Sequence, residues 1–100
     1  MTIAVFKTGP ARVTVTGEVD ASNAADFCVA LLDGARRGKP PLEVDLAGVT
    51  FMDSTGLRAI EDASEALAAS GSRVVLRNAP AHVLRIIEIL GIGDSLRVNR

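Results

Sequence analysis

The sequence predicts a single α/β domain, in which a mixed β-sheet of about four to five strands with an N-terminal hairpin packs against three to four helices. Three observations support this fold class. The chain has 100 residues, 48% of them hydrophobic, which suits one domain with one core. Two strand-like segments come first, as in a hairpin. Helix-like and strand-like segments then alternate, which indicates crossover helices between the later strands.

The first two predicted strands form the hairpin. Residues 2–7 are apolar and β-branched, and Gly9-Pro10 is a turn signal. Residues 12–16 then alternate strictly, with Val13 and Val15 on one face and polar side chains on the other. The alternation indicates that one face of the hairpin is covered.

A helix is predicted after the second strand. Gly17-Glu18-Val19-Asp20 ends that strand, and the side chain of Asp20 or of Ser22 could cap the free N–H groups of a first turn. The helix is expected to end at Gly34 or Gly38. Apolar residues recur between these points at helical spacing: Ala24, Phe27, Cys28, Leu31, Leu32 and Ala35.

The middle of the chain predicts a strand, a turn and a second helix. Residues 42–46 alternate as a strand, Ala47-Gly48 is interpreted as a turn, and residues 49–52 are extended. The second helix is expected over 57–69, with Gly71 as its C′ residue. Its buried face is predicted to hold Leu57, Ile60, Ala63 and Leu67, and its exposed face Arg58, Glu61, Asp62 and Glu65.

The last third of the chain predicts a strand, a helix and a strand. Residues 73–76 suit a short buried strand, Pro80 a helix start, and Gly91 the end of that helix. A final short strand is expected around Leu96 and Val98. No repeat or linker divides the chain, so a single domain over 1–100 is expected. The apolar face of the last helix is predicted to hold Val83, Ile86, Ile87 and Leu90.

Composition and charge exclude several classes of function. The formal net charge of −1 gives no signal for nucleic acid or an anionic membrane, and the absence of Trp and Tyr removes the usual stacking platforms for bases. Cys28 is the only cysteine, so an internal disulfide or a multi-cysteine metal site is excluded. No segment resembles a signal peptide or reaches the ~20 apolar residues of a membrane span. We expect a monomeric cytoplasmic protein without a metal or a cofactor.

One segment, residues 49–57, carries chemistry. An apolar strand leads through Asp53-Ser54-Thr55-Gly56 into an amphipathic helix, so Ser54 and Thr55 lie at a helix N-terminus. Unpaired N–H groups there would favour an anion by roughly 0.3–1 kcal/mol, and Gly56 would leave room for a partner to approach the backbone. A phosphate on Ser54 would add about −1.5 to −2 charge without unfolding the domain. The same pattern is typical of ordinary helix capping, so local sequence leaves both interpretations open.

The segment resembles the signature of STAS domains, and specifically of bacterial anti-sigma factor antagonists. These proteins carry Asp-Ser-Ser/Thr-Gly-Leu after an apolar pair like Phe51-Met52. Gly17-Glu18-Val19-Asp20 resembles the family's Gly-Glu-Leu-Asp motif, with Val19 in place of Leu. The C-terminal part, from Arg77-Asn78 to Ile92, also resembles the family pattern. Three motifs in the family's order imply a STAS-like fold over essentially the whole chain.

The resemblance implies roles for the motif residues. Ser54 corresponds to the phosphorylated serine, and Thr55 is the fallback acceptor. Asp53 would shape the turn and take part in kinase or partner recognition. Asp20 would lie near the acceptor and contact the partner, although it is also a candidate helix cap. Arg58 stands where relatives often carry a small or apolar residue, and it either tunes partner choice or is an ordinary exposed helix position.

The resemblance also implies a mechanism. Unphosphorylated, the domain would bind an anti-sigma factor and so release a sigma factor. Phosphorylation of Ser54 would abolish that binding through charge repulsion and desolvation. The anti-sigma factor of this family is a serine-protein kinase that holds ATP, and a phosphoserine phosphatase reverses the step. The chain would therefore be a substrate and not an enzyme.

Two other functions are compatible with the sequence. A scaffold or transport-associated STAS protein, such as a stressosome or lipid-transport complex component, would share the fold, but the intact Asp53-Ser54-Thr55 argues against it. A serine hydrolase would use Ser54 as its nucleophile, but His82 is the only histidine and the Gly-x-Ser-x-Gly pattern is missing. We expect His82 to be a surface residue and Cys28 a small buried hydrophobe.

Overall fold

The computed structural model describes residues 1–6, 9–91 and 97–99, and these form one sheet with helices packed on it. The strand order is β1-β2-β3-β4-β5; β1 and β2 are antiparallel, and all other neighbours are parallel. The elements are β1 Thr2–Val5, β2 Pro10–Val19, α1 Ala24–Arg36, β3 Lys39–Met52, α2 Ser54–Ala68, β4 Val74–Arg77, α3 Ala81–Leu90 and β5 Arg97–Asn99. The predicted α/β fold with an N-terminal hairpin is confirmed.

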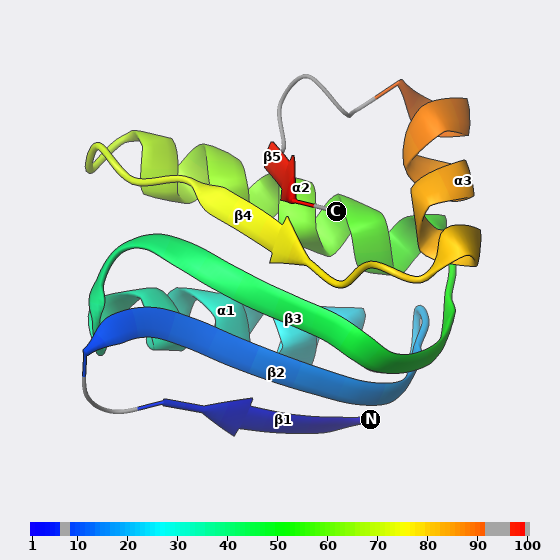
Figure 1. Cartoon of the computed structure of the whole chain (residues 1–100), viewed down its shortest axis with the longest axis horizontal. Helices are drawn as coiled ribbons and strands as arrows, with labels where there is room; N and C mark the ends of the chain where they lie inside the picture. Colours follow the sequence, from blue (N-terminus) through cyan, green and yellow to red (C-terminus); the bar gives the residue numbers. More distant parts are fainter. Residues whose placement is uncertain (7–8, 92–96, 100) are drawn as a thin grey trace.

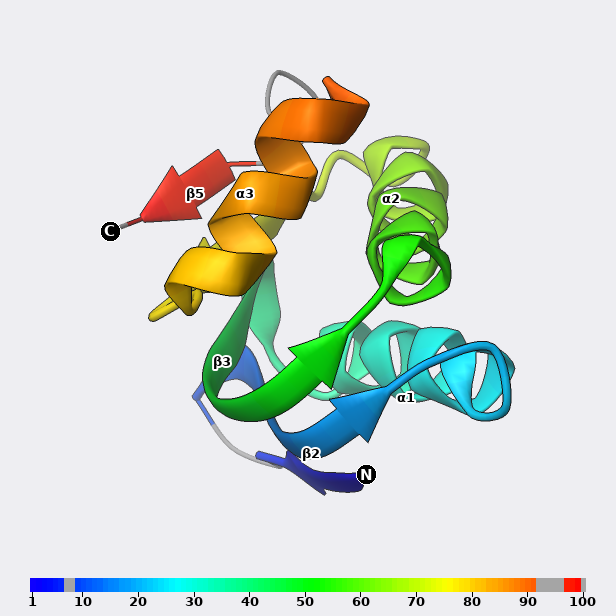
Figure 2. The same cartoon turned by 90° about the vertical axis from the view of Figure 1, so that its right-hand side faces the viewer.

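Helices α1 and α2 lie side by side on one face of the sheet, and α3 packs against α2 and β3 (Figures 1 and 2). The strict alternation in β2 and β3 explains this layering, because every second side chain is apolar and faces the helices. The hydrophobic core consists of fully buried side chains from both layers: Val13, Val15, Leu42, Val44 and Leu46 from the strands, and Phe27, Leu31, Leu57, Ile60 and Ala63 from the helices. The opposite face of β2 and β3 carries the polar members of the alternation.

The predicted turn at Ala47-Gly48 is wrong, because β3 runs without interruption from Lys39 to Met52. The pairing with β2 shifts register between Thr14 and Thr16, as a β-bulge does. The carboxylate of Asp45 stabilises this irregularity by accepting a hydrogen bond from the backbone N–H of Ala47 at 3.0 Å. A Cβ on Gly48 would lie 2.6 Å from Thr16 Cγ2, so glycine is needed here for close approach of the strands.

The predicted start of the first helix is wrong, whereas of its two predicted ends Gly38, which directly follows the C-cap residue Arg37, is confirmed and Gly34 is wrong. Helix α1 begins at Ala24 with Asn23 as its N-cap residue, and neither Asp20 nor Ser22 caps it. The carboxylate of Asp20 instead accepts a hydrogen bond from the N–H of Ser22 at 2.9 Å, which closes a turn that precedes the helix. Gly34 lies inside the helix, where a Cβ would come within 2.4 Å of a methyl group of the buried β2 residue Val13. Gly34 therefore serves packing, and the helix continues to Arg36.

The later helices follow the predicted pattern closely. Helix α2 begins at Ser54, three residues earlier than expected. Its predicted buried face is confirmed, and its predicted exposed face is confirmed except at Glu61, which is half-buried. Gly71 adopts a left-handed φ of 79°, and its N–H donates to the carbonyl of Ala68, as expected for a C′ residue. Pro80 precedes α3 and Gly91 ends it, but Leu90 is 39% exposed and does not belong to the buried face.

Cys28 is half-buried, and burial raises the pKa of its thiol, with a smaller contribution from Asp62. Strand β5 includes Val98, whereas Lys7, Ile92 and Leu96 lie outside the described residues. Within the described ranges, no helix is long and apolar enough to cross a membrane.

Candidate functional site

The candidate site lies where the carboxyl ends of β2 and β3 meet. These strands are parallel neighbours, with Glu18 paired to Phe51 and Val19 paired to Met52. One residue further, the N–H of Asp53 donates to the carbonyl of Val19 at 3.3 Å. The two sequence motifs therefore meet at one edge of the sheet, which faces the viewer in Figure 2 as the ends of β2 and β3 and the start of α2.

The side chain of Asp53 caps helix α2. Its Oδ1 atom accepts hydrogen bonds from the backbone N–H groups of Thr55 at 3.0 Å and Gly56 at 3.2 Å, and from the hydroxyl of Thr55. These bonds, that of the Thr55 hydroxyl above all, hold the pKa of Asp53 below its ordinary value despite the opposing effect of desolvation. The capping interpretation is confirmed, and Asp53 is a carboxylate at neutral pH.

The cap changes one expectation from the sequence. The first-turn N–H groups of Thr55 and Gly56 already donate to Asp53, so they are not available to bind an external anion. A phosphate on the neighbouring Ser54 would meet a carboxylate at this helix end. The helix N-terminus therefore offers that phosphate less stabilisation than the local sequence indicates.

The two hydroxyl groups of the motif differ in their bonding. Ser54 and Thr55 are both exposed, at the first two positions of α2. The Thr55 hydroxyl donates to Asp53, whereas the Ser54 hydroxyl makes no hydrogen bond with any described residue. Of the two, Ser54 has the side chain that is free to react.

Gly56 does not belong to the exposed surface, and the expectation that it lets a partner approach is wrong. It is buried, and a Cβ at this position would lie 2.8 Å from Met52 Cγ and 2.9 Å from Val19 Cγ1. Glycine is required because the first turn of α2 crosses close over the ends of β2 and β3. This contact fixes the position of Ser54 above the sheet.

Asp20 lies in a tightly bonded turn beside the motif. Its half-buried carboxylate accepts from the N–H of Ser22, and its own N–H donates to Asn23 Oδ1 at 3.0 Å. The Asn23 amide in turn donates to the carbonyl of Glu18 at 3.0 Å. These bonds hold the β2–α1 turn against the end of β2, and the pairing of β2 with β3 brings Asp20 to the same edge as Ser54.

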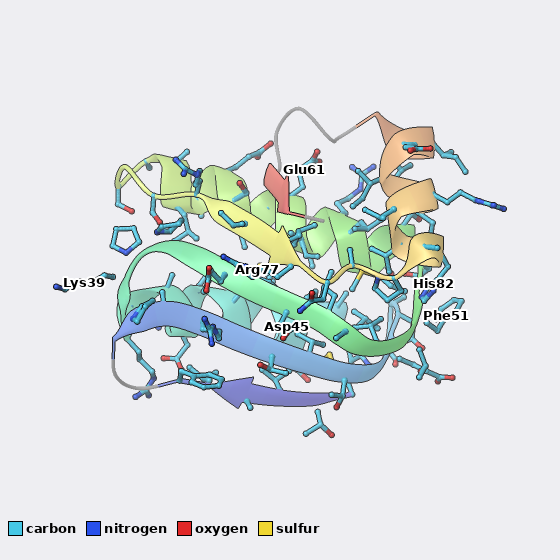
Figure 3. The ribbon with its side chains drawn as sticks, in the orientation of Figure 1. Lys39, Asp45, Phe51, Glu61, Arg77 and His82 are labelled. Atoms are coloured by element: carbon cyan, nitrogen blue, oxygen red, sulfur yellow. The ribbon has the colours of Figure 1, made fainter. Side chains whose placement is uncertain are left out.

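The other candidate residues lie on the surface. Arg58 is exposed on α2, as expected of an ordinary helix position. His82 is exposed near the start of α3, at the same end of the molecule as Phe51 in Figure 3. No hydrogen bond joins His82 to Ser54 in the part of the chain that the structure describes, and that part holds no cluster of three potential metal ligands. Among the described residues, therefore, no histidine is bonded to Ser54 as the base of a serine hydrolase would be.

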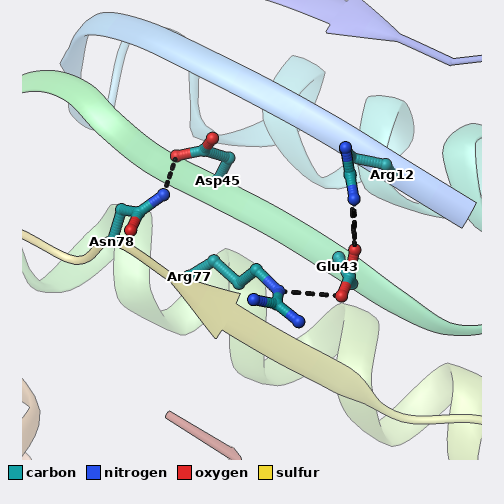
Figure 4. Close-up of polar contacts among 5 residues, drawn as sticks. All are labelled: Arg12, Glu43, Asp45, Arg77 and Asn78. Atoms are coloured by element: carbon teal, nitrogen blue, oxygen red, sulfur yellow. Dashed lines mark hydrogen bonds and ion pairs between the residues drawn. The ribbon is translucent and has the colours of Figure 1, made fainter. Parts of the chain in front are cut away.

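Two features of the structure were not predicted from the sequence. Phe51 is 46% exposed, although it belongs to an apolar pair. The signal was available, because adjacent strand residues face opposite ways and Met52 is buried. On the polar face of the sheet, Glu43 bonds Arg12 at 3.0 Å and Arg77 at 2.8 Å, which links three strands and lowers the pKa of Glu43, the Arg12 bond contributing most (Figure 4).

Comparisons with known proteins agree with the fold and with the family that the sequence resembles. The sequence model of the family described as "Mlab, STAS domain" matches residues 4–98. The anti-sigma-B factor antagonist of Listeria monocytogenes serovar 1/2a is 33% identical over 87 residues, which are 87% of this chain and 76% of that protein. The anti-sigma-B factor antagonist of Staphylococcus epidermidis is 29% identical over 88 residues, which are 88% of this chain and 82% of that protein.

Solved structures give the same picture. The anti-sigma factor antagonist SpoIIAA in its unphosphorylated form has a TM-score of 0.75 and 18% identity, covering 99% of this chain and 87% of that chain. The STAS domain of a SulP transporter from Vibrio cholerae has a TM-score of 0.61 and 19% identity, covering 91% of this chain and 73% of that chain. At these identities the likeness shows a common fold. With the match of the family model over residues 4–98, it follows that the chain belongs to the STAS domain family.

Proposed function

We propose that this chain is an anti-sigma factor antagonist that is switched off by phosphorylation of Ser54. The observation that carries this proposal is the exposed hydroxyl of Ser54, which is bonded to none of the described residues, beside a Thr55 hydroxyl that is bonded to Asp53. The relatives named as anti-sigma-B factor antagonists support the class of function. Unphosphorylated, the edge formed by Asp20, Asp53 and Ser54 binds the anti-sigma factor, which releases a sigma factor.

The electrostatics of the edge explain how a phosphate would act. Phosphorylation adds about −1.5 to −2 charge at Ser54. The adjacent Asp53 carboxylate, with its lowered pKa, stays ionised at neutral pH, and Asp20 and Glu18 lie on the neighbouring strand end and turn. A partner that faces this edge must then desolvate a dianion among carboxylates, which costs binding energy while the fold beneath stays intact.

The remaining parts of the mechanism belong to the partners. The anti-sigma factor acts as a serine-protein kinase and holds the ATP, and a phosphoserine phosphatase restores the active form. The antagonist itself works in the cytoplasm as a monomer, without a cofactor and without catalysis. Arg58, exposed on the first turns of α2, lies at the rim of the same surface.

The test is phosphorylation by the anti-sigma factor. The purified anti-sigma factors of the source organism are incubated in turn with ATP and the wild type, Ser54→Ala or Thr55→Ala, and phosphate is counted by intact mass. We expect one phosphate on the wild type and on Thr55→Ala, and none on Ser54→Ala. A phosphorylated Ser54→Ala chain would contradict the choice of Ser54, and an unmodified wild type would contradict the switch.

A transport-associated role is the second candidate, because STAS domains of transporters have the same fold. A murine solute carrier anion transporter, for example, has a TM-score of 0.68 at 22% identity over 83% of this chain, which is 14% of that chain. Such a role would not require a phosphorylation switch at Ser54. One measurement distinguishes the two candidate functions, the affinity of the Ser54→Asp variant for the partner protein. An affinity equal to that of the wild type would favour the transport-associated role.

A further inference from the structure

Phe51 is a large aromatic side chain that the fold leaves exposed near the end of β3. The chain has three phenylalanines. Phe27 is fully buried in the core, and Phe6, 45% exposed, has the guanidinium of Arg12 at 5.6 Å from its ring centroid. Phe51 is 46% exposed, and no cation or ring contact covers it in the described part of the chain. The core at this position is already filled by its neighbour Met52.

The backbone holds Phe51 in a fixed position relative to Ser54. It is the last but one residue of β3 and is paired with Glu18 of β2. Two residues later, Asp53 is tied to Val19 by its N–H and to the first turn of α2 by its carboxylate. A ring on such a rigid junction loses little conformational entropy when a partner covers it.

Acidic residues lie on both strand ends next to Phe51. Glu18 is its register partner, Asp53 follows two residues later, and Asp20 follows two residues after Glu18. Glu18 is exposed, and Asp20 and Asp53 are half-buried. An aromatic side chain bordered by polar groups has the anatomy of an interface hot spot, in which the ring carries affinity and the rim gives specificity. The negative rim matches a partner with basic side chains around an apolar pocket.

We propose that Phe51 is the apolar anchor by which this edge docks on the anti-sigma factor, and that its ring enters an apolar pocket bordered by basic side chains. The proposal rests on the proposed function, because it concerns the same partner. It also gives the phosphate a specific target. The ring is seated only when the surface around it is desolvated, and a dianion on Ser54, three residues away, opposes that desolvation.

Phe6 provides a matched control for the test. Binding to the anti-sigma factor that phosphorylates the wild-type chain is measured by surface plasmon resonance without ATP. The chains compared are the wild type, Phe51→Thr, Phe51→Leu, Phe6→Thr and Ser54→Asp. Threonine suits a strand, so the ring is removed with little change in strand propensity. Circular dichroism and the thermal midpoint verify that each variant is folded.

We expect Phe51→Thr to weaken binding at least about 30-fold, mainly through faster dissociation, with Phe51→Leu intermediate and Phe6→Thr within about threefold of the wild type. Wild-type affinity in both Phe51 variants, together with weak binding of Ser54→Asp, would overturn the anchor and leave the switch intact. Equal losses in Phe51→Thr and Phe6→Thr would also overturn it. Wild-type affinity in Ser54→Asp, with a loss confined to the Phe51 variants, would contradict the switch and support the anchor.

Discussion

Replacing Asp53 by alanine removes the cap that holds the candidate site in place. The carboxylate accepts from two backbone N–H groups, of Thr55 at 3.0 Å and Gly56 at 3.2 Å, and from the Thr55 hydroxyl. In Asp53→Ala these donors lose their partner at the first turn of α2. The matched variant is Asp53→Asn, because asparagine is an equally good N-cap but carries no charge.

The structure sets the size of the effect. Loss of an N-cap side chain costs about 0.5–2 kcal/mol, and the favourable interaction of the carboxylate with the helix dipole contributes roughly 0.3–1 kcal/mol. We therefore expect Asp53→Ala to lower the free energy of unfolding by about 1.5 kcal/mol at pH 7. In a chain of this length that lowers the thermal midpoint by about 6–12 °C. Asp53→Asn keeps the acceptor oxygen and should lose about 0.5 kcal/mol.

The measurement is urea unfolding of the three chains, followed by circular dichroism between pH 3 and pH 7 (range chosen around the ordinary carboxylate pKa of about 3.9). The pKa of Asp53 is lowered in the folded state, so its contribution is complete above the ordinary value and is lost as the pH falls through the folded value. The difference between wild type and Asp53→Ala should therefore shrink in acid. An alanine variant as stable as the wild type at pH 7 would refute the capping argument, and so would equal losses in both variants.

Three further predictions follow from contacts around the sheet. Glu43→Gln should lower the free energy of unfolding by about 1 kcal/mol at pH 7. Because the pKa of Glu43 in the folded state is below its ordinary value of 4.5, this difference should vanish as the pH falls through that lowered pKa. A difference that persists in acid would count against the ion pairs. Gly56→Ala should destabilise the folded domain by about 1 kcal/mol in thermal unfolding, because the added Cβ would lie 2.8 and 2.9 Å from buried side-chain atoms. A gain in stability would show that the higher helix propensity of alanine outweighs this overpacking. Thr55→Val should raise the pKa of Asp53 toward its ordinary value in an NMR titration, and an unchanged pKa would contradict the role of the Thr55 hydroxyl.

Patterns of local origin predicted most of the fold. The alternation of apolar residues around Val13 and their helical spacing around Ile60 each predict one buried face of a strand or a helix. The structure buries both of these faces. Pro80 and Gly91 mark the ends of α3 because their backbone preferences are intrinsic. The position of Ser54 at a helix start was predicted for the same reason, since Asp53 is a strong N-cap in almost any context.

Features that depend on register could not be predicted from one sequence. Gly48 is a turn signal in isolation, but in the structure β3 continues through it, and it pairs with Thr16 of β2 directly after a shift in register. Gly34 likewise ends helices elsewhere, and here it lies in α1 because the helix packs closely on Val13. The bridge from Glu43 to two neighbouring strands, and the different bonding of the two motif hydroxyls, depend on distances between residues that the sequence does not give.

The central claim is that a phosphate on Ser54 ends binding to the anti-sigma factor. The direct measurement is the affinity of that partner for the unphosphorylated chain and for the same chain carrying one phosphate, each purified and confirmed as folded. We predict that the phosphate weakens binding at least about 30-fold, the size expected when a buried, uncompensated charge enters an interface. Equal affinities of the partner for the two folded forms would contradict the proposed switch.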